Sequence, residues 1–104
     1  MQELPPERAR RQRADRAELG AILDELVRAL AHDLQKKGYL GKTVGIKLRF
    51  DDFKTVTRDL TLDLATAEAD AIRHAAGLCL KRVDFSRRIR LMGVRMASLR
   101  HAGR

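Results

Sequence analysis

The sequence has little of several residue types on which whole classes of protein depend. Its 104 residues include no tryptophan, one tyrosine, three phenylalanines and one cysteine, Cys79. A lone cysteine forms no intramolecular disulfide and builds no cysteine zinc site, so we expect Cys79 to pack in the core. Long apolar runs are also missing, whereas a membrane-spanning helix needs about 20 such residues. Residues 1–6 have no apolar signal segment, so we expect a cytoplasmic protein with no membrane partner.

Acidic residues are scarce relative to basic ones. Lys and Arg total 22 against 14 for Asp and Glu, which gives a formal net charge of +8. Residues 81–104 hold eight of the basic residues and one acidic residue, so this segment alone carries +7. Such a balance favours a polyanionic partner and places the binding signal near the end of the chain.

The length fits a single domain, and a hydrophobic content of 44% is enough to build a core. Residues 1–15 combine two prolines with several arginines and have almost no large apolar side chain. We therefore predict a basic, loosely structured N-terminal arm over this segment. The folded domain is predicted over residues 16–99, and residues 100–104 are predicted to form a polar C-terminal tail.

Hydrophobic periodicity predicts the order helix, strand, strand, helix, strand. Leucines recur at helical spacing between Leu19 and Leu34, with Asp15 as a cap and Gly38 at the end. Thr66 is the predicted cap of the second helix. Two helices on one face of an antiparallel sheet give an α+β fold whose other face is open. The predicted elements are helices 15–37 and 66–83 and strands 44–50, 54–62 and 88–99.

The first two predicted strands form a hairpin with a turn at Asp51 and Asp52. In the first strand apolar residues alternate with Lys47 and Arg49, so both cations are expected on the outward face. In the second strand Thr57 and Thr61 are expected on the outward side. Arg58 falls in the apolar phase, and its direction is left open.

The last predicted strand changes phase partway along. Its apolar residues hold one parity up to Leu91 and the other parity from Val94 onward. A β-bulge at residues 92–93 would reconcile the two halves, since glycine tolerates the geometry. Arg90 and Arg95 would then emerge on the same face.

No combination of residues predicts catalysis or metal binding. Adjacent carboxylates such as Asp51 and Asp52 are typical of turns, and no further ligand stands near them in the sequence. His32, His74 and His101 are scattered, and neither a phosphate-binding glycine loop nor a nucleophile motif is found. We predict no catalytic residue, no metal site and no cofactor in this chain.

The outward cations predict a basic sheet face that contacts phosphates, although an ordinary solvated face is the simpler alternative. Few aromatic side chains are available on that face, so stacking on unpaired bases is poorly supported. Contact with the backbone of a duplex fits better. The candidate binding residues from strand phase are Lys47, Arg49, Thr57, Thr61, Arg90 and Arg95.

Two sequence motifs resemble the little finger domain of Y-family DNA polymerases, of the bacterial DNA polymerase IV type. They are the hairpin KLRFDDFKTVTR, residues 47–58, and the strand RLMGVR, residues 90–95. The resemblance covers about residues 16–99. It implies a four-stranded sheet backed by two helices, which binds the backbone of primer-template duplex DNA during lesion bypass and DNA repair.

The resemblance also implies what this chain lacks. Magnesium and nucleotidyl transfer belong to the family's catalytic domain, so we expect no polymerase activity from this chain by itself. The polymerase catalytic core becomes an expected partner in the intact family. Carried over position by position, backbone contacts fall on Thr57, Arg58, Thr61, Arg90 and Arg95.

Two segments depart from the family pattern. Residues 1–15 do not resemble the strand that precedes the first helix in the family, which leaves open that the sheet lacks this strand. Residues 100–104 do not resemble the hydrophobic peptide with which many members bind the sliding clamp. A clamp contact is therefore not expected through the tail, and one through another surface is left open.

Two other functions stay open at this point. A missing strand would expose a sheet edge, and the chain would then act as a protein-interaction or dimerisation module whose charge only keeps it soluble. A small RNA-binding α+β protein would instead prefer single-stranded RNA. Duplex DNA binding without catalysis is the function that the sequence favours.

Overall fold

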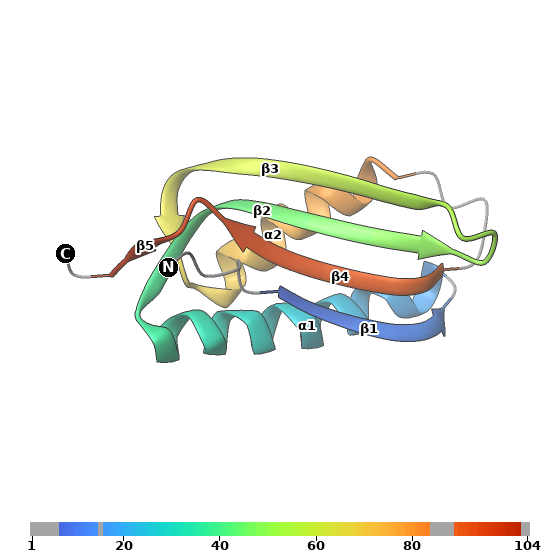
Figure 1. Ribbon diagram of the computed structural model, residues 1–104, viewed down its shortest axis with the longest axis horizontal. Helices are drawn as coiled ribbons and strands as arrows, with labels where there is room; N and C mark the ends of the chain where they lie inside the picture. Colours follow the sequence, from blue (N-terminus) through green and yellow to red (C-terminus); the bar gives the residue numbers. More distant parts are fainter. Residues whose placement is uncertain (1–6, 15, 84–88, 103–104) are drawn as a thin grey trace.

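The computed structural model describes residues 7–14, 16–83 and 89–102, and it has the predicted α+β architecture. Two helices cover one face of an antiparallel sheet, and Figure 1 looks onto the opposite, open face. No helix in these described ranges is long and apolar enough to cross a membrane. The elements are β1 (Glu7–Ala14), α1 (Arg16–Lys37), β2 (Tyr39–Phe50), β3 (Thr55–Thr66), α2 (Ala69–Lys81), β4 (Ile89–Ala97) and β5 (Arg100–His101).

The strands of the sheet lie in the order β1-β4-β2-β3, and every neighbouring pair is antiparallel. β2 and β3 form the predicted hairpin around a short turn. In this turn the Phe53 amide donates a hydrogen bond to the Phe50 carbonyl at 2.9 Å, and the Lys54 amide donates to Asp52 Oδ1 at 3.2 Å. The Asp52 side chain thus closes the turn, as expected of aspartate in this position.

The prediction of a loosely structured arm is wrong for residues 7–14, which form strand β1. This strand pairs with β4, with Arg8 opposite Val94 and Arg11 opposite Leu91 (Figure 1). Its partner lies some 80 positions away in the sequence, so composition alone does not reveal the pairing. Backbone hydrogen bonds to an available edge hold the strand even though it lacks an apolar pattern. The sheet therefore does not lack its first strand, and residues 1–6 and 15 of the predicted arm lie outside the described residues.

Part of the predicted polar tail is also paired. β5 lies antiparallel to the start of β2, and the rings of Tyr39 and His101 are 4.6 Å apart between centroids. The Ala102 amide donates a hydrogen bond to the Gly38 carbonyl at 2.7 Å. These contacts join the end of the described chain to the corner between α1 and β2.

The first helix begins and ends close to the predicted residues. Glu18 lies in its first turn and Lys36 and Lys37 lie in its last turn, where each charge interacts favourably with the helix dipole. Gly38 has a φ of 75°, the left-handed conformation that commonly ends a helix at glycine, as predicted. The second helix begins slightly later than predicted: Glu68 is its N-cap residue, and Thr66 Oγ1 accepts a hydrogen bond from the Glu68 amide at 3.0 Å.

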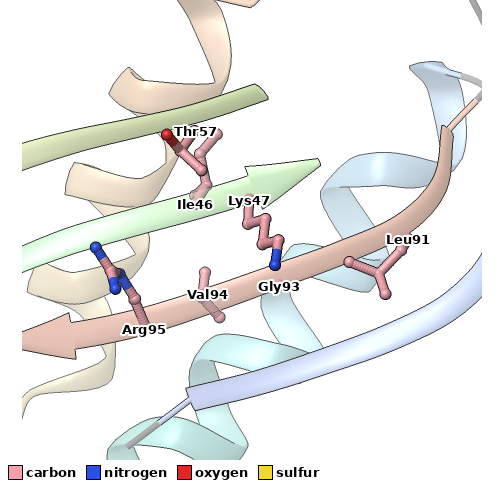
Figure 2. Close-up of a pocket in the computed structure, with 7 residues that line it drawn as sticks. All are labelled: Ile46, Lys47, Thr57, Leu91, Gly93, Val94 and Arg95. Atoms are coloured by element: carbon pink, nitrogen blue, oxygen red, sulfur yellow. The ribbon is translucent and has the colours of Figure 1, made fainter. Parts of the chain in front are cut away.

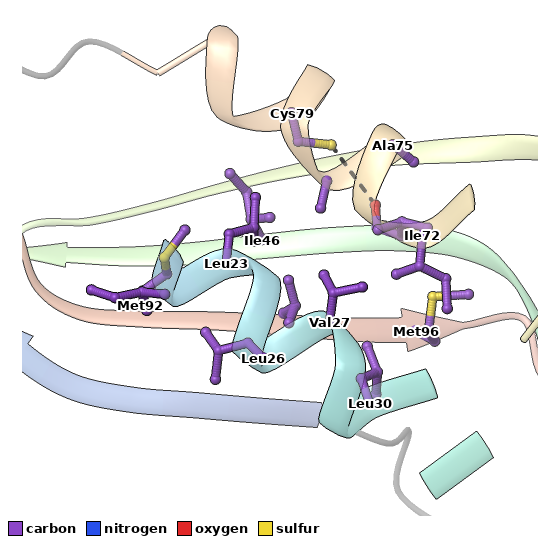
Figure 3. Close-up of a cluster of buried hydrophobic side chains, with 14 of the residues drawn as sticks. Leu23, Leu26, Val27, Leu30, Ile46, Ile72, Ala75, Cys79, Met92 and Met96 are labelled. Atoms are coloured by element: carbon purple, nitrogen blue, oxygen red, sulfur yellow. Dashed lines mark hydrogen bonds between the residues drawn. The ribbon is translucent and has the colours of Figure 1, made fainter. Parts of the chain in front are cut away.

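The core lies between the helices and the covered face of the sheet. In Figure 3 leucines of α1 and Ile72 of α2 point toward Met92 and Met96 of β4. The α2 face that packs there includes the small residues Ala75 and Ala76, which let this helix lie close to the sheet. The alternate residues of β2 that face the core are all buried: Val44, Ile46, Leu48 and Phe50.

Removal of residues 1–14 is expected to lower the free energy of unfolding by about 2 kcal/mol or more, because it exposes the edge of β4. Urea denaturation followed by circular dichroism measures the change, since the chain has no tryptophan. An unchanged midpoint and slope would contradict the contribution assigned to β1. Concentration dependence of the transition would report association through the uncovered edge.

Cys79 is expected to react only when the domain opens. It is 1% exposed, and burial raises the pKa of its thiol above the ordinary value of 9.0, with a smaller opposing effect from the charge of Arg82. At pH 8 we expect Ellman's reagent to modify the folded protein at least about 100-fold more slowly than the urea-unfolded protein. The raised pKa favours the neutral thiol in the folded state. The stabilisation linked to this neutral thiol is therefore complete below pH 9.0, the ordinary pKa, and is lost as the pH rises through the folded-state pKa. Equal rates of modification for the folded and the unfolded protein would contradict the burial of Cys79.

Candidate nucleic acid interface

The open face of the sheet carries the outward side chains of β2, as predicted from strand alternation. Lys47 and Arg49 are exposed. Ile46, which precedes them, and Leu48, which lies between them, are buried under the helices. A strand with one buried face must present its remaining side chains on the other. The core therefore determines the direction of both cations.

On β3 the structure brings two of the three predicted residues to the open face. Thr57 lies opposite Lys47, and Thr61 lies opposite Thr43, with 3.2 Å between the two threonine hydroxyl oxygens. Arg58 lies opposite Ile46, on the side of the helices, and is half-buried. Its Nη1 donates a hydrogen bond to the Thr57 carbonyl at 2.7 Å. The structure thus separates Arg58 from the other predicted binding residues.

The bulge in β4 is at Arg90, and the predicted position at residues 92–93 is wrong. Leu91 lies opposite Arg49, and Ile89 lies opposite the next residue of β2, which leaves Arg90 without an opposite residue. The extra residue changes the alternation of side chains two residues earlier than predicted. Leu91 therefore lies on the open face, half-buried, although its parity with Ile89 had indicated the core.

Arg90 lies at the end of the open face, next to the turn between β2 and β3. Its guanidinium carbon is 4.6 Å from the centroid of the Phe53 ring, within cation–π distance. Phe53 is 62% exposed and has a φ of 67°, a backbone conformation that is unfavourable for most residues other than glycine. The turn thus supports an exposed cation. Sequence reasoning identified Arg90 and missed Phe53, because nothing in the local pattern relates this turn to β4.

Cations and glycines alternate across β2 and β4 on the open face. Lys47 lies opposite Gly93, and Arg95 lies opposite Gly45, so no two cations are directly opposite each other. In Figure 2 Lys47 extends from β2 toward β4, and Arg95 extends from β4 toward β2. A hollow of about 260 Å³ lies on this face. Its lining residues are Ile46, Lys47, Thr57, Leu91, Gly93, Val94 and Arg95.

Arg95 also reaches an acidic residue on the far side of β2. Its Nη2 is 3.9 Å from Asp59 Oδ2, and the two side chains are 51% and 48% exposed. Gly45 lies between them, and a Cβ at this position would be 2.2 Å from Asp59 Oδ1. The strand pattern had placed Asp59 on the outward side of β3, but only the order of the strands shows that it reaches Arg95.

The open face combines exposed cations with threonine hydroxyls. Such a surface suits a ligand that presents several phosphate groups in a row. In the part of the chain that the structure describes, no group of three or more His, Cys, Asp or Glu residues is arranged to hold a metal ion.

Comparisons with known proteins agree on one kind of domain. A model of the impB/mucB/samB family C-terminal domain matches residues 8–104. The chain is 35% identical over 86 residues to DNA polymerase IV of Clostridioides difficile, a match that covers 82% of this chain and 24% of that protein. It is 41% identical over 83 residues to DNA polymerase kappa of Mus musculus, covering 75% of this chain and 10% of that protein. The chain thus spans about a quarter of the bacterial relative and less of the mouse one.

Solved structures share the fold. A chain from a complex of beta-clamp processivity factor and the little finger domain of PolIV has a TM-score of 0.71 and 23% identity, covering 88% of this chain and 86% of that chain. A DinB family error-prone DNA polymerase from Sulfolobus solfataricus has a TM-score of 0.74 and 13% identity, covering 89% of this chain and 28% of that chain.

A pair of substitutions separates the cation–π contact of the Phe53 ring with Arg90 from the backbone strain at its positive φ. Phe53→Ala removes the ring and keeps the left-handed backbone, so we expect it to lower the free energy of unfolding by about 0.5–1 kcal/mol. Phe53→Gly loses the ring as well but relieves roughly 1 kcal/mol of backbone strain, and we expect it to be about as stable as the parent. Urea denaturation compares the three proteins. If the alanine variant were as stable as the glycine variant, the turn would store no strain.

Proposed function

This chain belongs to the impB/mucB/samB family as its C-terminal domain, and from this premise we propose that it binds duplex DNA through the open face of its sheet. One observation carries the proposal. The sheet face that no helix covers presents Lys47, Arg49 and Arg95 beside threonine hydroxyls. The predicted resemblance to the little finger of bacterial DNA polymerase IV is confirmed at the level of the family.

The binding would be directed at the sugar-phosphate backbone. Lys47 and Arg95 would neutralise phosphates and release counterions, and the hydroxyls of Thr57 and Thr61 would donate hydrogen bonds. Contacts of this kind do not read base identity, so we expect little sequence preference and a steep dependence on salt.

Within a translesion polymerase, such a module would hold the primer-template duplex while a separate catalytic core acts on it. We propose that this chain contributes binding alone and that magnesium-dependent nucleotidyl transfer belongs to that core. The matched relatives are DNA polymerases of which this chain spans a minor part. The polymerase core and the primer-template duplex are then its first partners.

A sliding clamp is a further proposed partner. The support is the likeness in fold to a little finger solved with the beta-clamp processivity factor. Residues 100–104 include no hydrophobic run, and Arg100 and His101 pair with the start of β2. We propose a contact on the folded surface, because the likeness to that structure lies in the fold of the domain. Surface plasmon resonance with an immobilised bacterial clamp tests it. Loss of binding on removal of residues 102–104 would point to the tail instead.

Self-association through a sheet edge is less favoured than DNA binding. β1 covers β4, so the edges of the main sheet are β1 and β3. β3 carries Arg58, Asp59 and Asp63 along its length, and charged residues discourage pairing at an edge. A stable dimer in light scattering that showed no affinity for DNA would reverse this preference.

The double variant Arg90→Ala/Arg95→Ala tests the interface. We propose that Arg90, like Arg95, contacts a phosphate, so the loss of both is expected to weaken duplex binding by about 10-fold or more at moderate salt. It should also reduce the slope of log affinity against log salt by about 2, since each contact contributes about 0.9. Fluorescence anisotropy of a labelled primer-template duplex measures both quantities.

The matched control is Arg28→Ala/Lys36→Ala, which removes the same charge from exposed positions of α1. We expect this control to lose much less affinity, because α1 lies on the covered face of the sheet (Figure 1). Arg58→Ala should likewise have a smaller effect than Arg95→Ala. Equal losses in both double variants would mean that net charge, and not the open face, determines binding.

A further inference from the structure

A carboxylate stands among the cations of the face proposed to meet DNA. Asp59 belongs to the outward side of β3, between Thr57 and Thr61, and its side chain is 48% exposed. A free carboxylate at this position would repel the phosphates that its neighbours attract. Its effect on binding therefore depends on what it contacts in the DNA-free protein.

Asp59, Gly45 and Arg95 form one row across three neighbouring strands. Gly45 of β2 is opposite Asp59 of β3 on one side and opposite Arg95 of β4 on the other. The carboxylate and the guanidinium meet above the glycine, with 3.9 Å between Oδ2 and Nη2. A methyl group at position 45 would collide with Asp59 Oδ1, at 2.2 Å, and would come within 3.4 Å of Arg95 Nε. The glycine is thus the condition for this contact.

The ion pair is of the kind that another anion displaces. Its nitrogen and oxygen atoms are near the upper limit of ion-pair distance, and both side chains are half-exposed. Pairs at such positions contribute little to stability because water and salt screen them. A phosphate entering the hollow beside Arg95 would also gain the charge of Lys47, whereas Asp59 is free to rotate into water.

We propose that Asp59 is an internal counter-anion, which pairs with Arg95 across Gly45 in the free protein and is exchanged for a DNA phosphate on binding. The proposal rests on the proposed function, because it concerns the same face. The loss of the pair between Arg95 and Asp59 offsets part of the free energy that Arg95 contributes to DNA binding. The domain therefore binds duplex more weakly than its cations alone would allow, which suits a module that must release and rebind as a polymerase advances.

Asp59→Asn is the direct test, since asparagine has nearly the same shape and no charge. We expect this variant to bind a primer-template duplex about three- to five-fold more tightly at low salt. The gain should shrink as salt rises. Asp63→Asn is the matched control: it removes the same charge from the same strand, at an exposed residue for which the described structure shows no ion pair with Arg95. Its gain should stay below about two-fold.

A double-mutant cycle isolates the pair from the general change in charge. In the background of Arg95→Ala, the gain from Asp59→Asn should fall to that of Asp63→Asn. Circular dichroism shows whether each variant of the cycle is folded.

The outcomes separate the inference from the function beneath it. If the folded parent protein binds no duplex, the proposed function fails and the inference fails with it. If the parent binds duplex but Asp59→Asn gains no more than Asp63→Asn, the inference alone is overturned. Weaker binding by Asp59→Asn would also overturn it, and would mean that Asp59 holds Arg95 in place for DNA.

Discussion

The burial of one sheet face beneath two helices is the constraint on which the rest of this domain depends. Each strand of the sheet has side chains on both faces, so burying one face determines which side chains remain for the other. In β2 the buried Ile46 and Leu48 oblige Lys47 and Arg49 to face outward. A one-residue change of register would bury the cations and expose the core, so the same apolar contacts that stabilise the fold also orient the cations of the open face.

Two glycines, Gly45 and Gly93, determine the arrangement of charges on the open face. Gly45 and Gly93 lie opposite Arg95 and Lys47, which separates like charges and keeps the surface shallow. Gly45 has a second effect, because its missing side chain lets Asp59 reach Arg95. Glycine usually weakens a strand interior. Both glycines are buried here, and the side chains of Asp59 and Arg95 meet above Gly45.

Family membership and local chemistry support the same function from different directions. The matched relatives are DNA polymerases, and this chain corresponds to their C-terminal domain rather than to their full length. The described surface offers cations and hydroxyls for contact with phosphates. Both observations support the proposal that this domain binds DNA on which another domain acts. An internal counter-anion would keep that hold reversible.

The sequence by itself determined the two helices, the hairpin, the α+β class and the outward direction of Lys47 and Arg49, because each depends on a short periodic pattern of apolar residues. Only the tertiary structure decided that residues 7–14 form a strand, because the partner β4 that stabilises it lies at the opposite end of the chain. The same holds for the bulge at Arg90 and for the contact between Asp59 and Arg95. Both depend on register between strands, which is set by the packing of the whole sheet and not by any local run of residues.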